Sequence, residues 1–122
     1  MNRLWIALGA LAGLTAVGLS AWSAHGLPQM LQPASLDAVR SAITLQGWHA
    51  LALLATGIYA ERRGGILPHL AGAAFAIGLV LFCGAVYAAN LAGIRLGPVA
   101  PAGGIALMLG WAMLFLAAVK RP

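Results

Sequence analysis

The sequence predicts an all-α integral membrane protein, an antiparallel four-helix bundle in which residues 1–122 form a single transmembrane domain. Hydrophobic residues make up 62% of the chain and charged residues 7%, whereas roughly a quarter of the residues of a soluble domain are charged. The chain also contains four apolar stretches of the ~20 residues that a helix needs to cross a bilayer. Because the connections between these stretches are short, consecutive helices are expected to be antiparallel neighbours.

The four predicted spans take up most of the chain. Their expected bounds are 4–24, 41–60, 67–91 and 101–119. The first span follows Arg3 and ends near small residues, as a secretory signal does, but its apolar run is longer than a signal core. We therefore expect it to be retained as a membrane helix.

Residues at the starts of the later helices support these bounds. Ser35 is a candidate cap for the second helix and Asp37 is expected in its first turn, so this helix is predicted to begin before the membrane proper. Pro68 and Pro101 fall in the first turns of the third and fourth helices, where the missing N–H of proline costs little.

The positions of the cations predict an orientation. Four spans place both termini and the turn between the second and third helices on one side. That side has five basic residues, against Arg40 and Arg95 on the other: Arg3, Arg62, Arg63, Lys120 and Arg121. Because short loops rich in Lys and Arg stay in the cytoplasm, the N- and C-termini are expected on the cytoplasmic side of a bacterial inner membrane. These cations form no basic stripe, so no nucleic-acid partner is expected.

Small residues recur along three of the predicted helices. Lipid gives helices no hydrophobic reason to associate, so small residues at the contacts decide how closely they pack. The predicted packing positions are Gly9 and Gly13 in the first helix, Gly72 and Ala76 in the third, and Ala106 and Gly110 in the fourth. This pattern predicts a tight bundle.

The stretch "LQGWHALALL", residues 45–54, carries Gln46 and His49 inside an apolar segment. Side chains three residues apart lie near one another on a helix, and each would cost a few kcal/mol if it faced lipid without a partner. Partners predicted at a similar depth include Tyr87, Asn90 and His25. Two interpretations stay open: a hydrogen-bond cluster that fixes helix register, or an intramembrane ligand site.

The sequence favours no metal and no cofactor. His25, His49 and His69 are expected at different depths, so a haem held between two histidines does not fit. The acidic residues Asp37 and Glu61 stand at the ends of the second span, away from the histidines. The single cysteine, Cys83, allows no intrachain disulfide, and no pattern of catalytic residues stands out.

Four motifs occur in an order that resembles a known family. They are "SAHGL", "LQGWHALALL", "LFCGAVYAANLAG" and "GPVAPAGG" followed by "LGW". Together they resemble the small membrane proteins catalogued as domain of unknown function 423, which include YgdD-like proteins and transmembrane protein 256. The resemblance implies a four-helix fold and a role for His25, Gln46, His49 and Tyr87, and it implies no activity. Leu45 stands where the family pattern has tyrosine, and "CGAVY" stands where it has "SGSLY".

These features predict a non-enzymatic role in the membrane. We expect an accessory or stabilising subunit of a larger membrane complex, such as a respiratory complex, or a homo-oligomer. Its expected partners are the lipid bilayer and either another membrane protein or further copies of itself. The alternative is a site for quinone, lipid or proton transfer built on Gln46 and His49.

Overall fold

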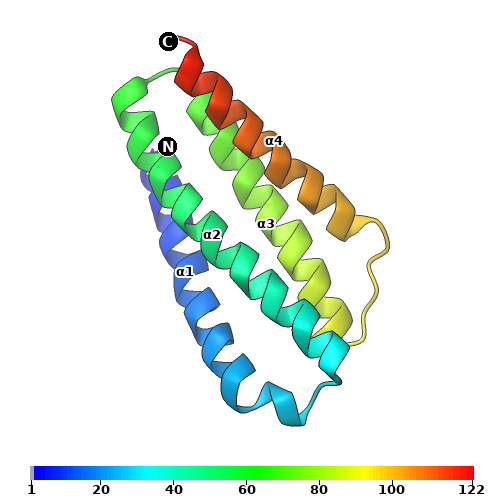
Figure 1. The fold of residues 1–122 in the computed structure, drawn as a ribbon. Helices are drawn as coiled ribbons and strands as arrows, with labels where there is room; N and C mark the ends of the chain where they lie inside the picture. Colours follow the sequence, from blue (N-terminus) through cyan, green and yellow to red (C-terminus); the bar gives the residue numbers. More distant parts are fainter. Residues whose placement is uncertain (1) are drawn as a thin grey trace.

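The computed structural model describes residues 2–122 and is all-helical over that range. Its elements are α1 (Asn2–His25), the short 3-10 helix η1 (Leu27–Gln29), α2 (Pro33–Arg63), α3 (Leu67–Leu91) and α4 (Val99–Val119). The long helices alternate in direction, and the two ends of the chain lie at the same end of the bundle (Figure 1). The predicted antiparallel helical membrane bundle is confirmed.

The helix bounds agree with the predicted spans at most ends. The clear difference is α2, which begins at Pro33, ahead of the predicted span 41–60, as expected for a helix that starts before its span. Proline has the backbone geometry of a first helical residue, so Pro33 starts the helix directly after Gln32. The predicted cap was wrong, because Ser35 lies inside the helix and Asp37 lies beyond its first turn.

The helices differ in how apolar they are and in how deeply they are buried. By length and composition, α1, α3 and α4 are apolar enough to cross a membrane, and α2 is not one of the three. However, α2 has eleven buried residues, against four in α1 and four in α4. The least apolar helix therefore has the largest number of buried residues, eleven against eight in α3.

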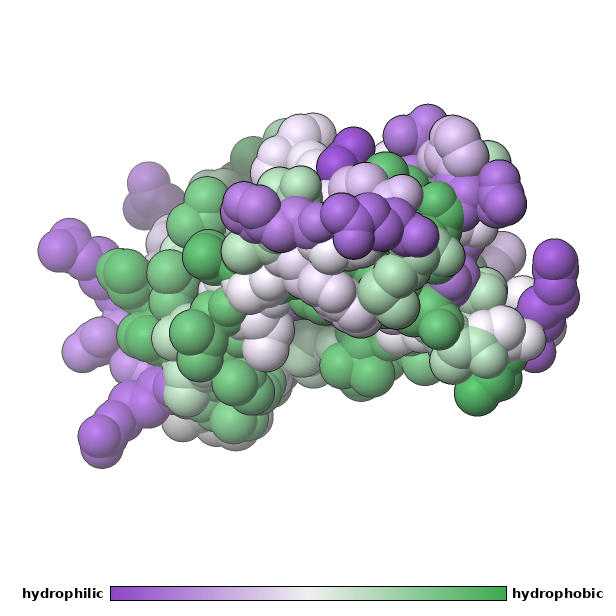
Figure 2. Space-filling view, turned by 90° about the horizontal axis from the view of Figure 1, so that it is seen from below, coloured by the Kyte–Doolittle hydropathy of each residue, from purple (hydrophilic) through white to green (hydrophobic). Residues whose placement is uncertain are grey.

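Helix contacts divide the chain into two hairpins. Helix α1 packs along α2, helix α4 packs along α3, and α2 joins the hairpins by packing on α3 (Figure 1). Buried side chains from α1, α2, α3 and α4 form one core, which includes Trp5, Leu53, Phe75 and Leu107. In Figure 2, long hydrophilic side chains project at the two sides of the view, and hydrophobic residues fill much of the surface between them.

Glycines set the closest approaches within each hairpin. A Cβ on Gly9 would lie 2.8 Å from the carbonyl oxygen of Ala50, and a Cβ on Gly78 would lie 2.8 Å from the backbone nitrogen of Leu107. A Cβ on Gly103 would collide with the backbone of Phe82. Since no side chain fits at these points, the glycines allow backbone-to-backbone contact between helices.

The predicted packing residues fall into two groups. Gly9, Gly72 and Gly110 occupy close contacts, the last two against the rings of Trp5 and Phe75. In contrast, an added Cβ on Gly13 would be at an ordinary distance of 3.8 Å from the Cβ of Ala50.

Ala76 and Ala106 are only half-buried. Helix α4 buries Gly103, Leu107 and Gly110, so the face that it turns inward is offset from Ala106.

At the end of the bundle that holds the termini, Arg63 fastens α2 to α4. Its Nε donates to the carbonyl of Ala117 at 2.7 Å, and its NH2 group donates to the carbonyl of Lys120 at 2.9 Å. The last carbonyls of a helix have no partner within that helix, so these bonds satisfy the end of α4. Gly64 and Gly65 follow with φ of 75° and 81°, which allows the sharp turn into α3.

Candidate functional site

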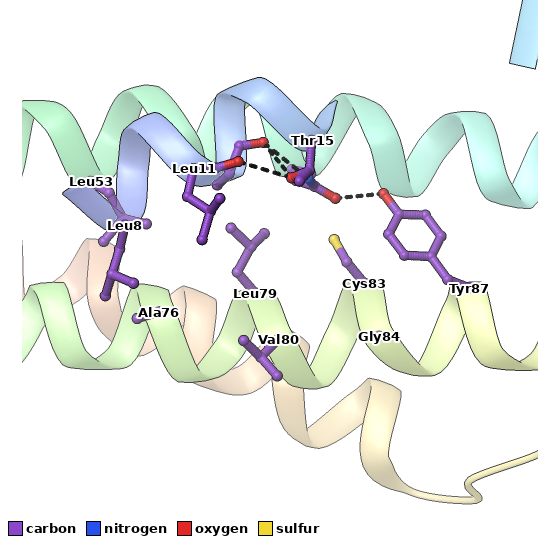
Figure 3. Close-up of a pocket in the computed structure, with 12 residues that line it drawn as sticks. Leu8, Leu11, Thr15, Leu53, Ala76, Leu79, Val80, Cys83, Gly84 and Tyr87 are labelled. Atoms are coloured by element: carbon purple, nitrogen blue, oxygen red, sulfur yellow. Dashed lines mark hydrogen bonds between the residues drawn. The ribbon is translucent and has the colours of Figure 1, made fainter. Parts of the chain in front are cut away.

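Gln46 is the centre of a hydrogen-bond network that joins three helices. From α2, its Nε2 donates to the carbonyl of Ala12 at 3.0 Å and to Oγ1 of Thr15 at 2.7 Å, both on α1. The hydroxyl of Tyr87 on α3 donates to Oε1 of Gln46 at 2.7 Å (Figure 3). Gln46 is itself only 6% exposed, so its amide is shielded from lipid, and its hydrogen bonds go to the neighbouring helices.

Backbone carbonyls fix the direction of the hydrogen bonds in this network, because a carbonyl can only accept. The Ala12 carbonyl can only accept, which assigns the amide nitrogen of Gln46 to that side and its oxygen to Tyr87. The hydroxyl of Thr15 accepts from Gln46 and donates to the carbonyl of Leu11 at 3.0 Å. All the donors of Gln46, Thr15 and Tyr87 are therefore used, and what remains unused are acceptor lone pairs.

A cavity of about 380 Å³ lies beside this network, between α1 and α3 (Figure 3). Leu11 on α1 and Leu79 on α3 extend into it from opposite sides (Figure 3). Its lining is mostly apolar and consists of Leu8, Leu11, Ala12, Thr15, Gln46, Leu53, Ala76, Leu79, Val80, Cys83, Gly84 and Tyr87. The thiol of the buried Cys83 donates to the carbonyl of Ala42 at 3.4 Å.

His49 is the centre of a second, separate group. Its Nδ1 carries a proton, because it lies 2.7 Å from the carbonyl of Leu45, which can only accept. Its Nε2 is therefore bare and accepts from the indole nitrogen of Trp111 on α4 at 3.0 Å. The rings of His49, Phe75 and Trp111 pack together, with Phe75 and Trp111 edge-on and their centroids 5.0 Å apart.

The structure divides the residues of the predicted polar cluster. Gln46 and Tyr87 are brought together, while His49 turns toward α4. Side chains three apart on a helix diverge by about 60°, which is enough to send them into different gaps around α3. His25 bonds to the carbonyl of Ala21 in its own helix, and Asn90 bonds to the carbonyl of Val86 in its own helix.

Thr15 and Trp111 are site residues that the sequence analysis missed. Each carried a usable signal: Thr15 is a hydroxyl in the middle of an apolar helix, and Trp111 has an indole N–H inside its span. The hydrogen bond from the indole of Trp5 to Nδ1 of His69, which is 2.9 Å long, was not predicted from the sequence either. His49 and His69 therefore each accept a hydrogen bond from a tryptophan.

The polar side chains in the interior of the bundle are satisfied by hydrogen bonds. Within residues 2–122, no buried side-chain nitrogen or oxygen lacks a hydrogen-bond partner. The same range contains no group of three or more His, Cys, Asp or Glu side chains placed to hold a metal ion. The hydrogen bonds of Gln46 and His49 link α2 to each of the other three long helices.

Comparison with known proteins supports the resemblance noted in the sequence. The family described as "Protein of unknown function (DUF423)" matches residues 19–104. The UPF0382 membrane protein YwdK of Bacillus subtilis (strain 168) is 36% identical over 120 residues, which cover 97% of this chain and 98% of that protein.

The UPF0382 inner membrane protein YgdD of Escherichia coli (strain K12) is 29% identical over 120 residues, which cover 98% of this chain and 92% of that protein. No solved structure matches the chain. With its helical fold, its apolar helices and these relatives, the chain is a multi-pass membrane protein that belongs to the DUF423 family.

Proposed function

We propose that the protein is a non-enzymatic accessory subunit that packs, within the membrane, against the transmembrane helices of another integral membrane protein. The interior favours this role over catalysis, because its polar groups are engaged with other helices or with their own backbone. The network of Gln46 and the pair of His49 and Trp111 serve to hold the helices in register.

The observation that carries the proposal is the position of Trp48. It stands at the midpoint of α2, yet its side chain is 63% exposed. Tryptophans that anchor a protein to the bilayer sit near the two interfaces, as Trp22 does near the end of α1. Trp48 lies far from both ends of its helix and has no such reason to face outward, whereas tryptophan is enriched where proteins meet.

Trp48 belongs to a continuous exposed stripe of α2. The members of this Trp48 face are Thr44, Trp48, Leu51, Ala55 and Ile58, all exposed and spaced by three or four residues. The stripe is apolar except for Thr44, whose hydroxyl bonds to the carbonyl of Arg40 in the same helix. A transmembrane helix with an apolar face is the partner that this chemistry fits.

We also propose that the end of the bundle that holds both termini faces the cytoplasm. The folded chain places Arg3, Arg62, Arg63, Lys120 and Arg121 at this end. Arg40 and Arg95 belong to the opposite end. An excess of Lys and Arg marks the cytoplasmic side of membrane proteins.

The experiment compares three forms of the tagged protein, extracted gently from the membrane of its own cell and examined by native mass spectrometry. The wild type is expected to carry a stoichiometric membrane-protein partner, and Trp48→Leu is expected to lose it. Trp22→Leu makes the same substitution at a helix end and is expected to keep the partner. All three are expected to unfold at the same temperature, because neither tryptophan lies in the core.

Two results would contradict the proposal. One is a wild-type protein that appears only as a monomer or only bound to copies of itself. The other is a Trp48→Leu variant that keeps the partner in the same proportion as the wild type.

A further inference from the structure

We infer that the cavity between α1 and α3 is a binding site for a long-chain alcohol, a molecule with an apolar chain and a single hydroxyl at its end. The chain would lie along the leucines of the cavity, and the hydroxyl would donate a hydrogen bond to the network of Gln46, Thr15 and Tyr87. This inference goes beyond the accessory role and does not depend on it, because the Trp48 face contributes no residue to the cavity.

The size and lining of the cavity fit a single apolar chain. Its volume of about 380 Å³ lies within the range of about 300–1,000 Å³ that is usual for small-molecule pockets. Apolar side chains and glycine make up most of its wall, including Leu8, Leu53 and Leu79. At its mouth, Leu11 and Val80 are 57% and 72% exposed, so the cavity opens sideways toward the hydrocarbon of the bilayer.

The cavity exists because α1 and α3 meet at one place and are held apart at another. Near the termini, the ring of Trp5 packs directly on Gly72 of α3. Further along, Gln46 and Tyr87 link the helices through side chains rather than through close backbone contact. Apolar space of this size beside lipid is filled most readily by a molecule that is itself lipid-soluble.

The polar end of the cavity selects the chemistry of the ligand. Thr15, Gln46 and Tyr87 all line it, and their hydrogens are already donated to fixed acceptors. Only acceptor lone pairs remain to meet a ligand, so the matching group must donate a hydrogen bond. A hydroxyl satisfies this condition, whereas the carbonyls of an oxidised quinone or of an ester can only accept.

The depth of the hydrogen-bond network in the membrane excludes a ligand with a charged headgroup. Thr15, to which Gln46 donates, lies thirteen residues into α1, which corresponds to about 20 Å along the helix, close to its middle. A phosphate or ammonium group at this depth would lose its hydration without gaining an ion partner, because the residues that line the cavity are uncharged. A neutral hydroxyl requires only one hydrogen bond and is satisfied by the acceptors present.

The first experiment maps where a long-chain alcohol binds. The protein is placed in nanodiscs of phosphatidylcholine, a lipid without a hydroxyl donor, and labelled by light with hexadecanol that carries a diazirine in the part of its chain next to the hydroxyl. Mass spectrometry is expected to find adducts concentrated on Leu11 and Val80, over Met108 of α4, which is 71% exposed outside the cavity. Equal labelling of Met108 and Leu11 would show partition into lipid and would overturn the inference.

Competition between unlabelled ligands tests whether the hydroxyl group is recognised. Unlabelled hexadecanol is expected to suppress labelling of Leu11, and hexadecyl methyl ether is expected to be about fivefold weaker, the change that the loss of a hydrogen bond worth about 1 kcal/mol produces. Decylubiquinone, which has only acceptors on its ring, is expected to compete no better than the ether. If the ether or the quinone competes as well as the alcohol, the inference is wrong.

A matched pair of glycine variants tests whether the alcohol binds in this cavity. Gly84 lines the cavity, and a Cβ added to it meets nothing within 4 Å, so Gly84→Phe is expected to block the mouth without disturbing the helices. Gly18 is also open on its outer side but lies outside the cavity, so Gly18→Phe is the control. Labelling of Leu11 is expected to disappear in the first variant and to persist in the second, with equal helicity by circular dichroism. Undiminished labelling in a folded Gly84→Phe protein would overturn the inference.

Discussion

The indole of Trp111 on α4 donates a hydrogen bond to Nε2 of His49 on α2, across the boundary between the two hairpins. The other ring nitrogen of His49 donates to the carbonyl of Leu45, so the imidazole is held from both sides in one tautomer. Phe75 of α3 packs against both rings. One contact thus brings three helices together around a single histidine.

We expect Trp111→Phe to lower the free energy of unfolding by about 0.6–1.7 kcal/mol, which are the average and the largest value measured for hydrogen bonds between membrane helices. Phenylalanine keeps an aromatic ring against Phe75 but removes the N–H donor, so Nε2 of His49 loses its partner. The measurement is reversible unfolding in mixed detergent micelles, followed by circular dichroism.

A double-mutant cycle separates this bond from the packing around it. His49→Phe removes the acceptor, and the double variant removes both groups. If the hydrogen bond matters, the two substitutions together cost less than the sum of their separate effects. Strict additivity would show that the contact between Trp111 and His49 contributes no energy of its own.

The second prediction concerns glycines that look alike in the sequence. We expect Gly103→Ala to destabilise the protein by about 1–3 kcal/mol, because the added Cβ would collide with the backbone of Phe82 and the helices must move apart. Gly13→Ala is the matched control, since its Cβ would be 3.8 Å from the Cβ of Ala50, an ordinary contact.

Thermal unfolding of the two alanine variants under the same conditions checks this prediction. Gly13→Ala is expected to leave stability unchanged or to raise it by up to about 1 kcal/mol, because alanine is the better helix former. A Gly103→Ala variant as stable as the wild type would mean that helix α4 does not approach α3 as closely as the structure describes.

The third prediction concerns orientation. Fusions of green fluorescent protein and of alkaline phosphatase to the C-terminus are expected to be fluorescent and inactive, respectively, if the basic end of the bundle is cytoplasmic. A fusion that reports on the loop between α3 and α4, near Arg95, is expected to give the opposite result. Active phosphatase at the C-terminus would reverse the proposed orientation.

Much of the fold could be predicted from the sequence because hydropathy alone locates helices in a membrane. The bounds of α3 match the predicted 67–91, since its apolar stretch and the helix coincide. The start of helix α2 ahead of its apolar stretch was also predicted, but the exact start was wrong, because the helix begins at Pro33 and not directly after a Ser35 cap. Proline at position 33 was the better signal.

The polar site was predictable only in part. The pairing of Gln46 with Tyr87 follows from the need of a buried amide to find a partner at its own depth. The separation of His49 from Gln46 depends on where α1 and α4 stand around α2, which hydrophobic periodicity does not encode. The same holds for Thr15, whose value as a partner depends on α1 facing Gln46.

The bonds between α1 and Gln46 have a consequence for how the protein is made. Helix α1 is synthesised first, and it provides both the carbonyl of Ala12 and the flat surface at Gly9 against which α2 fits. Helix α2 is the least apolar of the long helices and gains these contacts only beside α1. We therefore expect the two to leave the translocon together as a hairpin, so that a defect in α1 shows itself as failed insertion of α2.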